Sequence, residues 1–249
     1  ILAHIYGIPG KIYLIKKIAK KYHIPIIEDS AETLGASINN QKCGTFADIG
    51  IFSFNGNKII TSGGGGAIVS SNKKIIENSK FLSRQARDNF AFYEHSKLGY
   101  NYRMSNVLAA IGRAQLSSLN RKILNRKKIF KFYKKYFSKF NNIILHSYSG
   151  DTKYKHQSNY WICNIIFTNK ISIDDLVNEF RIYKIEARHL WKPMHKQPIY
   201  KNYQYFGDNL SENLFLSGIS LPSSSSLNKY DLDYMAKIFD KIFKKFSCL

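Results

Sequence analysis

The chain has 249 residues, of which 44% are hydrophobic and 14% aromatic, enough for a core in one large domain or two modest ones. No apolar run approaches the ~20 residues of a transmembrane helix and no signal-sequence pattern opens the chain, so we expect no membrane segment and no leader. The net charge of +21 is compatible with nucleic-acid binding, but the lysines are spread along most of the chain, which favours solvated faces.

Cysteine and histidine usage indicates neither a disulfide framework nor a metal site. The three cysteines, Cys43, Cys163 and Cys248, are odd in number and widely scattered. The seven histidines show no metal-ligand spacing, and no Ser-His-Asp or Cys-His pattern rises above chance. We therefore expect no metal, and a reducing cytoplasm as the location.

The first thirty residues predict a strand, a helix and a second strand. Ile1–Ile5 forms an apolar run, Ile12–Tyr22 has apolar side chains at helical spacing, and Ile24–Ile27 forms another apolar run. This order favours a parallel sheet, whose ligands bind at the carboxyl ends of its strands, where Asp29 is placed. The chain begins at Ile1, without methionine and inside the first expected strand, so we expect it to be part of a longer protein.

Lys58 lies between two further expected strands, Ile49–Phe54 and Ala67–Ser70, and the glycine run Gly63–Gly66 follows it. A helical pattern then covers Ile75–Arg87. A longer apolar helix begins after Ser105, which is a plausible N-cap.

Leu119–Phe140 predicts a basic helix with an aromatic stripe. Such a helix can lie on a membrane surface, but packing of the stripe in a core is favoured. Alternating strands and helices follow, ending in an amphipathic helix for which Asn228 is a possible cap. We therefore expect residues 1–118 to form the C-terminal part of a large domain and residues 119–249 a smaller α+β domain.

Three side chains in this order match the needs of pyridoxal 5′-phosphate (PLP), although each alone has an ordinary reading. Lys58 would supply an amine for the cofactor aldehyde and afterwards move a proton, and the ordinary alternative is a solvated loop lysine. Asp29 would keep the ring nitrogen protonated, or it could cap a helix or pair with a lysine. Ser53 would donate to the phosphate, and the glycine run permits close backbone approach.

His189, Lys192 and His195 surround Trp191 in a basic, aromatic loop stiffened by Pro193. Such a loop suits a diphosphate and the face of a base or sugar. It could equally be a packed turn.

The ordered segments resemble the DegT/DnrJ/StrS family, the PLP-dependent sugar aminotransferases of the aspartate aminotransferase fold (fold type I). The resemblance runs over essentially the whole chain and implies an α/β fold with a mostly parallel sheet and a smaller C-terminal domain. It is carried by Glu28-Asp29-Ser30-Ala31-Glu32, Phe52-Ser53-Phe54-Asn55-Gly56-Asn57-Lys58, Gly99-Tyr100-Asn101-Tyr102-Arg103-Met104-Ser105, Asn159-Tyr160-Trp161 and Trp191-Lys192-Pro193-Met194-His195.

By position, the resemblance makes Lys58 the lysine that bonds to PLP, Asp29 the partner of its ring nitrogen and Ser53 a phosphate ligand. Glu32 takes the place beside the ring. Asn101 and Arg103 would reach across a homodimer interface into the neighbour's cofactor site.

The resemblance implies transfer of an amino group from glutamate to a UDP-linked 4-keto-6-deoxy-N-acetylhexose, for a bacterial surface glycan or glycoprotein. His189 stands where that branch often has proline. Relatives that eliminate water instead carry histidine at the position of Lys58. A PLP-dependent dehydratase, another transaminase and an inactive basic binding fragment remain alternatives. Family members begin with roughly a further third of chain, so the expected activity belongs to the complete protein.

Overall fold

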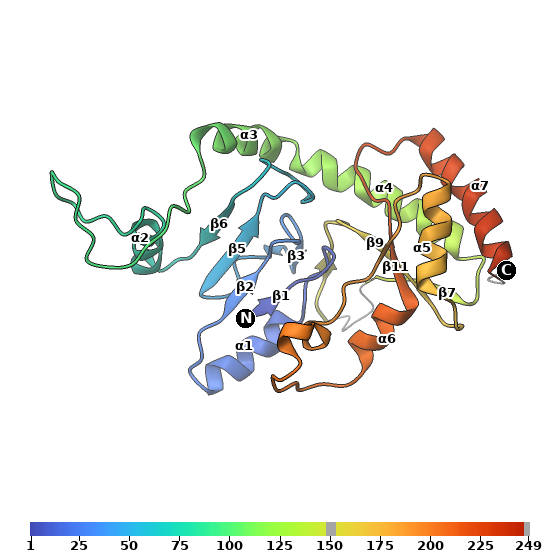
Figure 1. The fold of residues 1–249 in the computed structure, drawn as a ribbon, viewed down its shortest axis with the longest axis horizontal. Helices are drawn as coiled ribbons and strands as arrows, with labels where there is room; N and C mark the ends of the chain where they lie inside the picture. The colour runs from blue at the N-terminus through green and yellow to red at the C-terminus, as the bar shows by residue number, and fades with distance from the viewer. Residues whose placement is uncertain (148–152, 247–249) are drawn as a thin grey trace. The chain divides into compact units, whose positions relative to one another are not determined.

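The computed structural model describes residues 1–147 and 153–246 (Figure 1). Its contacts divide the chain into two compact units. The first comprises Ile1–Leu124 and Tyr148–Trp161, and the second comprises Asn125–Ser147 and Ile162–Leu249. The two domains expected from the sequence, divided after residue 118, stay a prediction.

The first unit is built on a mostly parallel sheet, as the sequence predicts. The strand order is β1-β2-β5-β6, in which β1, β2 and β5 run parallel and β6 is antiparallel to β5. A smaller antiparallel sheet has the order β4-β3-β8. The strands are β1 (Leu2–Ala3), β2 (Ile27–Asp29), β3 (Ser37–Ile38), β4 (Gln41–Lys42), β5 (Ile49–Ser53), β6 (Gly66–Val69) and β8 (His156–Gln157).

Helix α1 (Ile12–Lys21) covers one face of the parallel sheet (Figure 1). Its apolar side chains recur at helical spacing, so Ile12 and Ala19 are buried together with Ile26 and Ile38, and Leu2 packs against them. The lysines of α1 face solvent. The β1-α1-β2 order confirms the parallel unit expected from the first thirty residues.

Two of the strands expected at the start of the chain are wrong in their bounds. The expected strand Ile1–Ile5 contracts to Leu2–Ala3 at the sheet edge, and Ile1 is 92% exposed. The expected strand Ile24–Ile27 is shifted to Ile27–Asp29. Pro25 lacks the N–H that a central strand donates, which explains the later start.

Helices α2 (Lys73–Leu82) and α3 (Asn106–Ser117) complete the first unit. The helical pattern expected to continue to Arg87 stops earlier, because Gln85 and Ala86 have positive φ angles of 63° and 49°. Ser105 caps α3 as predicted, accepting a hydrogen bond from the Leu108 N–H at 3.3 Å.

The second unit contains an antiparallel sheet with the order β10-β11-β9-β7. Its strands are β7 (Ile143–Leu145), β9 (Cys163–Phe167), β10 (Arg188–His189) and β11 (Gly218–Leu221). Helix α4 (Leu119–Phe137) belongs to this unit from Asn125 onward, and its first turns belong to the first unit. The other helices are α5 (Ile173–Ile182), the short η1 (Met194–Lys196) and η2 (Pro198–Tyr200), α6 (Leu210–Ser217) and α7 (Lys229–Lys245).

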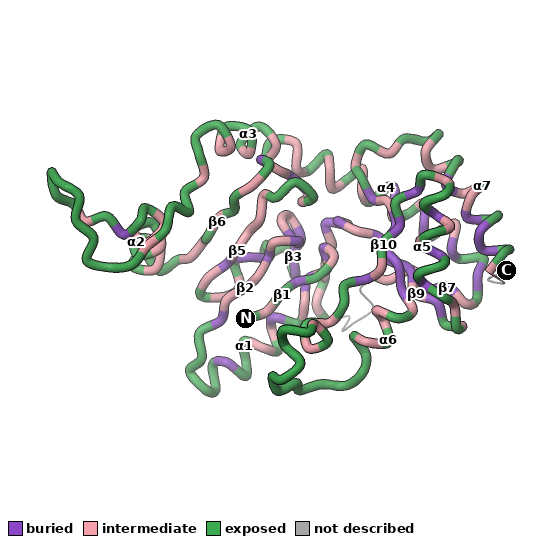
Figure 2. Tube along the Cα trace, viewed as in Figure 1, coloured by how far each residue is buried: buried purple, intermediate pink, exposed green. Residues whose placement is uncertain are grey.

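The aromatic stripe of α4 lies in the core of the second unit, as favoured from the sequence. Ile129, Tyr133 and Phe137 are each at most 2% exposed, and they pack with α5, α7 and β9 (Figure 2). Phe239 and Phe243 of α7 are fully buried beside them. Burial of these aromatic rings contributes to the hydrophobic stabilisation of the unit.

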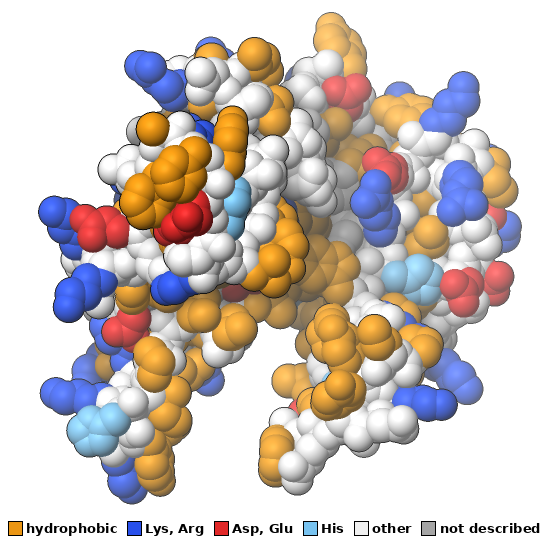
Figure 3. Space-filling view, turned by 60° about the vertical axis from the view of Figure 1, so that its left-hand side comes forward, with side chains coloured by type: hydrophobic (Ala, Val, Ile, Leu, Met, Phe, Trp, Pro, Cys, Tyr) orange, Lys and Arg blue, Asp and Glu red, His pale blue; other side chains and the backbone are white. Residues whose placement is uncertain are grey.

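The chain carries a net charge of +21. Figure 3 shows Lys and Arg side chains scattered over the face in view, with acidic and apolar side chains between them. Within the described residues, every helix is too short or too polar to cross a lipid bilayer.

Candidate active site

Asp29 and Ser53 project from the same face of the sheet, near the carboxyl ends of two adjacent parallel strands. Asp29 of β2 is the register partner of Ile51 in β5, and Ser53 follows two residues later. Side chains two residues apart on a strand share a face. The fold therefore brings an acid and a hydroxyl together where an α/β sheet binds ligands, as the sequence predicts.

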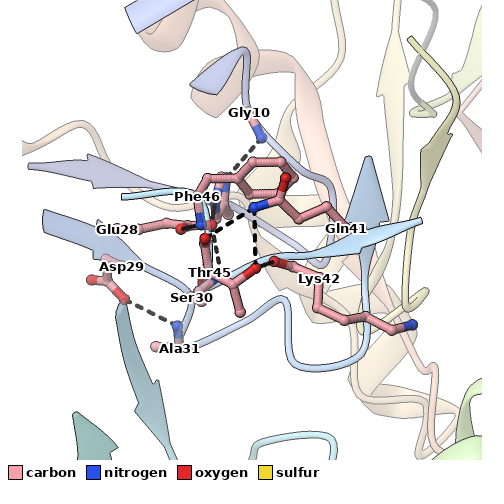
Figure 4. Close-up of polar contacts among 11 residues, drawn as sticks. Gly10, Glu28, Asp29, Ser30, Ala31, Gln41, Lys42, Thr45 and Phe46 are labelled. Atoms are coloured by element: carbon pink, nitrogen blue, oxygen red, sulfur yellow. Dashed lines mark hydrogen bonds and ion pairs between the residues drawn. The ribbon is translucent and has the colours of Figure 1, made fainter. Parts of the chain in front are cut away.

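Each of these two side chains keeps hydrogen-bonding capacity for a ligand. The half-buried Asp29 accepts a hydrogen bond from the Ala31 N–H through Oδ1 at 3.0 Å (Figure 4), and a carboxylate has a second oxygen. Ser53 Oγ accepts from the Asn55 N–H at 3.3 Å. Its own O–H can therefore donate, for example to a phosphate oxygen.

Lys58 and Glu32 form a close pair beside Asp29. Lys58 Nζ lies 3.7 Å from Glu32 Oε1, and the two side chains are only 13% and 9% exposed. Glu32 Oε2 accepts a hydrogen bond from the Tyr6 N–H at 2.7 Å. Because its side chain is largely buried, Lys58 is not a solvated loop lysine, which was the ordinary alternative.

Burial raises the pKa of the Glu32 carboxyl to about 7. The neighbouring Asp29 charge also raises this pKa, while the Tyr6 N–H and the Lys58 ammonium act in the opposite direction. A carboxyl with such a pKa can hold or release a proton near neutral pH. Glu32 is therefore suited to exchange a proton with a group beside it.

Trp161 and the backbone N–H of Tyr6 also contact this pair, and the sequence analysis assigned no role to either residue. The Trp161 ring lies under Lys58, with Nζ 4.5 Å from the ring centroid. Its indole N–H donates to the Asn57 carbonyl at 2.9 Å. Trp161 stands about a hundred positions from Lys58 in the sequence, and the only signal was its place in the segment Asn159-Tyr160-Trp161.

Glu28, next to Asp29, points away from the candidate site and holds a buried turn (Figure 4). It accepts hydrogen bonds from the backbone N–H groups of Gly44 at 2.6 Å and Phe46 at 2.9 Å, and it contacts His4 Nε2 at 2.9 Å. Burial alone would raise the pKa of Glu28, but the bonds from His4, Gly44 and Phe46 outweigh it and hold the pKa below its ordinary value.

The potential ligand atoms of His4, Glu28 and Cys43 lie within 4.8 Å of one another. His4 Nδ1 accepts from the Gly10 N–H at 2.8 Å, so Nε2 carries the ring proton and donates to Glu28. Burial raises the pKa of the Cys43 thiol to about 12, and a thiol is a poor metal ligand. These bonds make the cluster a structural network.

The structure places Asn101 and Arg103 in a separate hollow of about 760 Å³. Arg84 and Arg87 line the same hollow, and Asn101 pairs with Arg84 through an isolated β-bridge. All four are exposed. The fold of one chain therefore does not bring these two predicted cofactor ligands to the Lys58 cluster.

The expected substrate loop lies in the second unit, and two of its three named side chains have partners there. His189 Nε2 contacts Asp174 Oδ1 at 3.0 Å. His195 Nε2 contacts Glu212 Oε1 at 3.0 Å, and its ring stacks on Tyr205 with centroids 3.7 Å apart. Lys192 is exposed.

Lys192 and Glu212 line a small cavity of about 250 Å³ together with Lys196 and Phe215. Lys196 Nζ lies 2.9 Å from Glu212 Oε2. Hydrogen bonds from Lys196 and His195 hold the pKa of Glu212 below its ordinary value. The role of His189, Lys192 and His195 in substrate binding stays a prediction.

The residues of the first unit fit PLP by their chemistry. Lys58 would supply the amine, Asp29 an acceptor for the ring N–H and Ser53 a donor for the phosphate, and all three lie in one unit of the fold. Glu32 connects Lys58 and Asp29, because its carboxyl interacts with both.

The sheets and helices of the two units have the fold of the PLP-dependent transferases of fold type I. Among solved structures, the aminotransferase PseC from Helicobacter pylori, involved in the biosynthesis of pseudoaminic acid, superposes with a TM-score of 0.89 at 22% identity. The match covers 98% of this chain and 66% of that chain.

The chain belongs to the DegT/DnrJ/EryC1/StrS aminotransferase family, whose model matches residues 1–240. The resemblance derived from the motifs is confirmed. Three curated relatives show the range of proteins that this chain resembles. EpsN of Bacillus subtilis (strain 168), provisionally named as a pyridoxal phosphate-dependent aminotransferase, is 38% identical over 92% of this chain. The GDP-perosamine synthase of Escherichia coli O157:H7 is 33% identical over 96%.

The third relative is the UDP-4-amino-4,6-dideoxy-N-acetyl-beta-L-altrosamine transaminase of Campylobacter jejuni subsp. jejuni serotype O:23/36 (strain 81-176), 30% identical over 93% of this chain. The chain spans 59% of EpsN, 64% of the Escherichia coli synthase and 62% of the Campylobacter transaminase.

Proposed function

We propose that the complete gene product is a PLP-dependent aminotransferase. It moves an amino group from glutamate to the 4-keto carbon of a nucleotide-linked 4-keto-6-deoxy-N-acetylhexose, for a bacterial surface glycan or glycoprotein. The observation that carries this proposal is the buried cluster in which Lys58 Nζ lies 3.7 Å from Glu32, whose carboxyl also interacts with Asp29. Membership of the family over residues 1–240 supports it.

When bound, PLP supplies an electron sink that stabilises the charge left on carbon when a proton is removed. Asp29 would hold the ring N–H through its free carboxylate oxygen and so maintain the positive charge of the ring. Ser53 would donate its O–H to the phosphate. The Lys58 amine would move a proton between the α-carbon of the amino donor and the cofactor carbon.

UDP is the proposed carrier. The combination of Phe54-Asn55-Gly56-Asn57-Lys58 with Trp191-Lys192-Pro193-Met194-His195 supports this choice, because it resembles the branch that aminates UDP-linked sugars. The Campylobacter relative is named for a UDP-sugar product, whereas the Escherichia coli relative is named for a GDP-sugar. A direct comparison of the two carriers is therefore part of the test.

The proposed protein works in the cytoplasm as a homodimer in which Asn101 and Arg103 serve the partner's site. Their place in an exposed hollow apart from Lys58 supports this arrangement. So do the exposed apolar side chains near them, among which Tyr102 is 75% and Val107 70% exposed. The molar mass of the complete gene product in solution, measured by light scattering, tests the dimer. A monomer at micromolar concentration would contradict it.

The proposed activity is tested by supplying the complete gene product with PLP, glutamate and UDP- or GDP-linked 4-keto-6-deoxy sugars. We expect amination of a UDP-linked N-acetylated sugar and release of 2-oxoglutarate. Lys58→Ala should lower the rate by at least about 100-fold. Lys17→Ala, on the exposed face of α1, is the control and should leave the rate unchanged.

Three outcomes would overturn parts of this proposal. Substantial turnover by Lys58→Ala would remove the assigned role of the lysine. Amination of only GDP-linked sugars would overturn the carrier. Loss of water from the sugar without uptake of nitrogen would identify a dehydratase.

A further inference from the structure

Trp161 contacts both Lys58 and the peptide that precedes it. The indole is 2% exposed, and Lys58 Nζ lies 4.5 Å from its ring centroid. The indole N–H donates to the Asn57 carbonyl at 2.9 Å. One side chain therefore fixes the amine at the end of the lysine and the backbone at its base.

The segment that contains Trp161 is hydrogen-bonded to the segment that contains Glu32. Asn159 is fully buried, and its Oδ1 accepts from the Trp161 N–H at 3.0 Å. Its Nδ2 donates to the carbonyls of Glu32 at 2.8 Å and Leu34 at 3.0 Å. The two side chains that contact the lysine amine are thus set at a fixed spacing by Asn159.

One residue directly before Trp161 adopts a backbone conformation that costs free energy. Tyr160, between Asn159 and Trp161, has a φ of 56°, which is uncommon for a residue other than glycine. Gly7 has a φ of 85°, and a Cβ there would lie 2.1 Å from Asn159 Oδ1. The fold keeps the Tyr160 conformation, and at Gly7 only glycine leaves room for the Asn159 side chain.

Lysine has a long flexible stem, so an unrestrained amine would sample many positions. Attraction of the ammonium to the face of a tryptophan reduces this freedom, most strongly where water is excluded. Glu32 and Trp161 both contact the amine, and Asp29 is a further charge near Glu32.

We propose that Trp161 is a positioning residue that holds the Lys58 amine where it meets the cofactor aldehyde. In that step Nζ forms a double bond to the aldehyde carbon, and the aldehyde oxygen leaves as water with both amine hydrogens. The inference rests on the proposed function, since it takes Lys58 as the lysine that bonds to PLP. It adds a residue that neither sequence motif nor family membership assigns.

The test measures how fast the cofactor-free complete gene product attaches PLP to Lys58. Samples are reduced with borohydride at successive times, and the mass of the Lys58 peptide is followed. Trp161→Leu should slow attachment about 5- to 30-fold, because it removes both contacts. Trp161→Phe keeps an aromatic face but loses the N–H donor, so its rate should lie between those of the unsubstituted protein and Trp161→Leu.

A second measurement separates positioning from a structural role. In a Lys58→Ala background, where only non-covalent binding is possible, adding Trp161→Leu should change the PLP dissociation constant by less than about twofold. A merely structural role would weaken this binding as well. Phe140→Leu, in the core of the other unit, controls for general destabilisation and should leave the attachment rate unchanged.

Attachment by Trp161→Leu within about twofold of the unsubstituted rate would overturn the inference. If that variant does not fold, Trp161→Phe decides: an unchanged rate overturns the inference, and a slower rate with unchanged non-covalent binding supports it. Attachment of PLP to another lysine in the unsubstituted protein would overturn the proposed function instead.

Discussion

At the scale of single residues, Glu32 connects the parts of the candidate site. Its carboxyl accepts a hydrogen bond from the Tyr6 N–H, lies 3.7 Å from the Lys58 amine and interacts with the charge of Asp29. Burial is the main reason that its pKa rises to about 7. The family resemblance assigned Glu32 only a place beside the cofactor ring. With a pKa of about 7, its carboxyl also titrates near neutral pH.

This shift predicts a pH dependence of stability in the cofactor-free protein. The pKa of Glu32 is about 7 in the folded state and 4.5 at its ordinary value, so between these pH values the folded state binds a proton that the unfolded state has released. The free energy of unfolding therefore falls as pH rises from 4.5 to 7 and changes no further on this account above 7. Below 4.5 the carboxyl is protonated in both states.

Glu32→Gln should remove this part of the pH dependence. Urea unfolding from pH 4.5 to 8 measures it in the variant and the unsubstituted protein. Glu77→Gln changes an exposed glutamate on α2 and serves as the control. Parallel stability curves for Glu32→Gln and the unsubstituted protein would contradict the assigned protonation.

Gly7 gives a second prediction at this scale. Gly7→Ala should destabilise the first unit by at least about 1 kcal/mol, because φ is positive there and a Cβ would collide with Asn159. Gly64→Ala is the matched control, since a Cβ at Gly64 meets no atom within 4 Å. Chemical denaturation compares the two, and equal unfolding midpoints would refute the argument.

The residues of the site differ in how far the sequence could reveal them. Asp29, Ser53 and Lys58 lie on or just beyond neighbouring strands, so strand order and local motifs are enough to bring them together. Trp161 reaches the same site through a contact between residues about a hundred positions apart, which no periodicity indicates. The partners of His195, which are Glu212 and Tyr205, were likewise invisible until the loop was folded.

At the scale of elements, helix ends were predicted best where a side chain caps them. Asn228 accepts from the Asp231 N–H at 3.2 Å, and the Asp231 carboxylate accepts from the Asn228 N–H at 2.9 Å. This reciprocal pair is a capping box and confirms Asn228 as the cap of α7. The end of α2 was missed, because nothing in the sequence signals the positive φ angles of Gln85 and Ala86.

The capping box yields a prediction for the second unit. Asn228→Ala should lower its free energy of unfolding by about 1 kcal/mol, since the Asp231 N–H loses its side-chain acceptor. Asn209 precedes α6 without a side-chain capping bond, so Asn209→Ala should change the free energy of unfolding by only about a few tenths of a kcal/mol. Equal losses in the two variants, measured by urea denaturation, would show that the cap is not what stabilises α7.

At the scale of the whole molecule, the sequence predicted the fold class but could not show which surfaces are covered. The periodicity of α3 predicts an apolar face, yet none of its residues is buried, and Ile111 is 44% exposed. Amphipathic spacing shows that a face is apolar and says nothing of what covers it. The chain spans 59% to 64% of the three curated relatives, so the proposed activity concerns the complete gene product.

The most direct test of the account is to find where PLP becomes attached. The complete gene product is loaded with PLP, reduced with borohydride, digested and analysed by mass spectrometry. We expect one modified peptide with the added mass on Lys58, and no modified peptide from Lys58→Ala. Modification at a different lysine, or none at all, would contradict the assignment of this site.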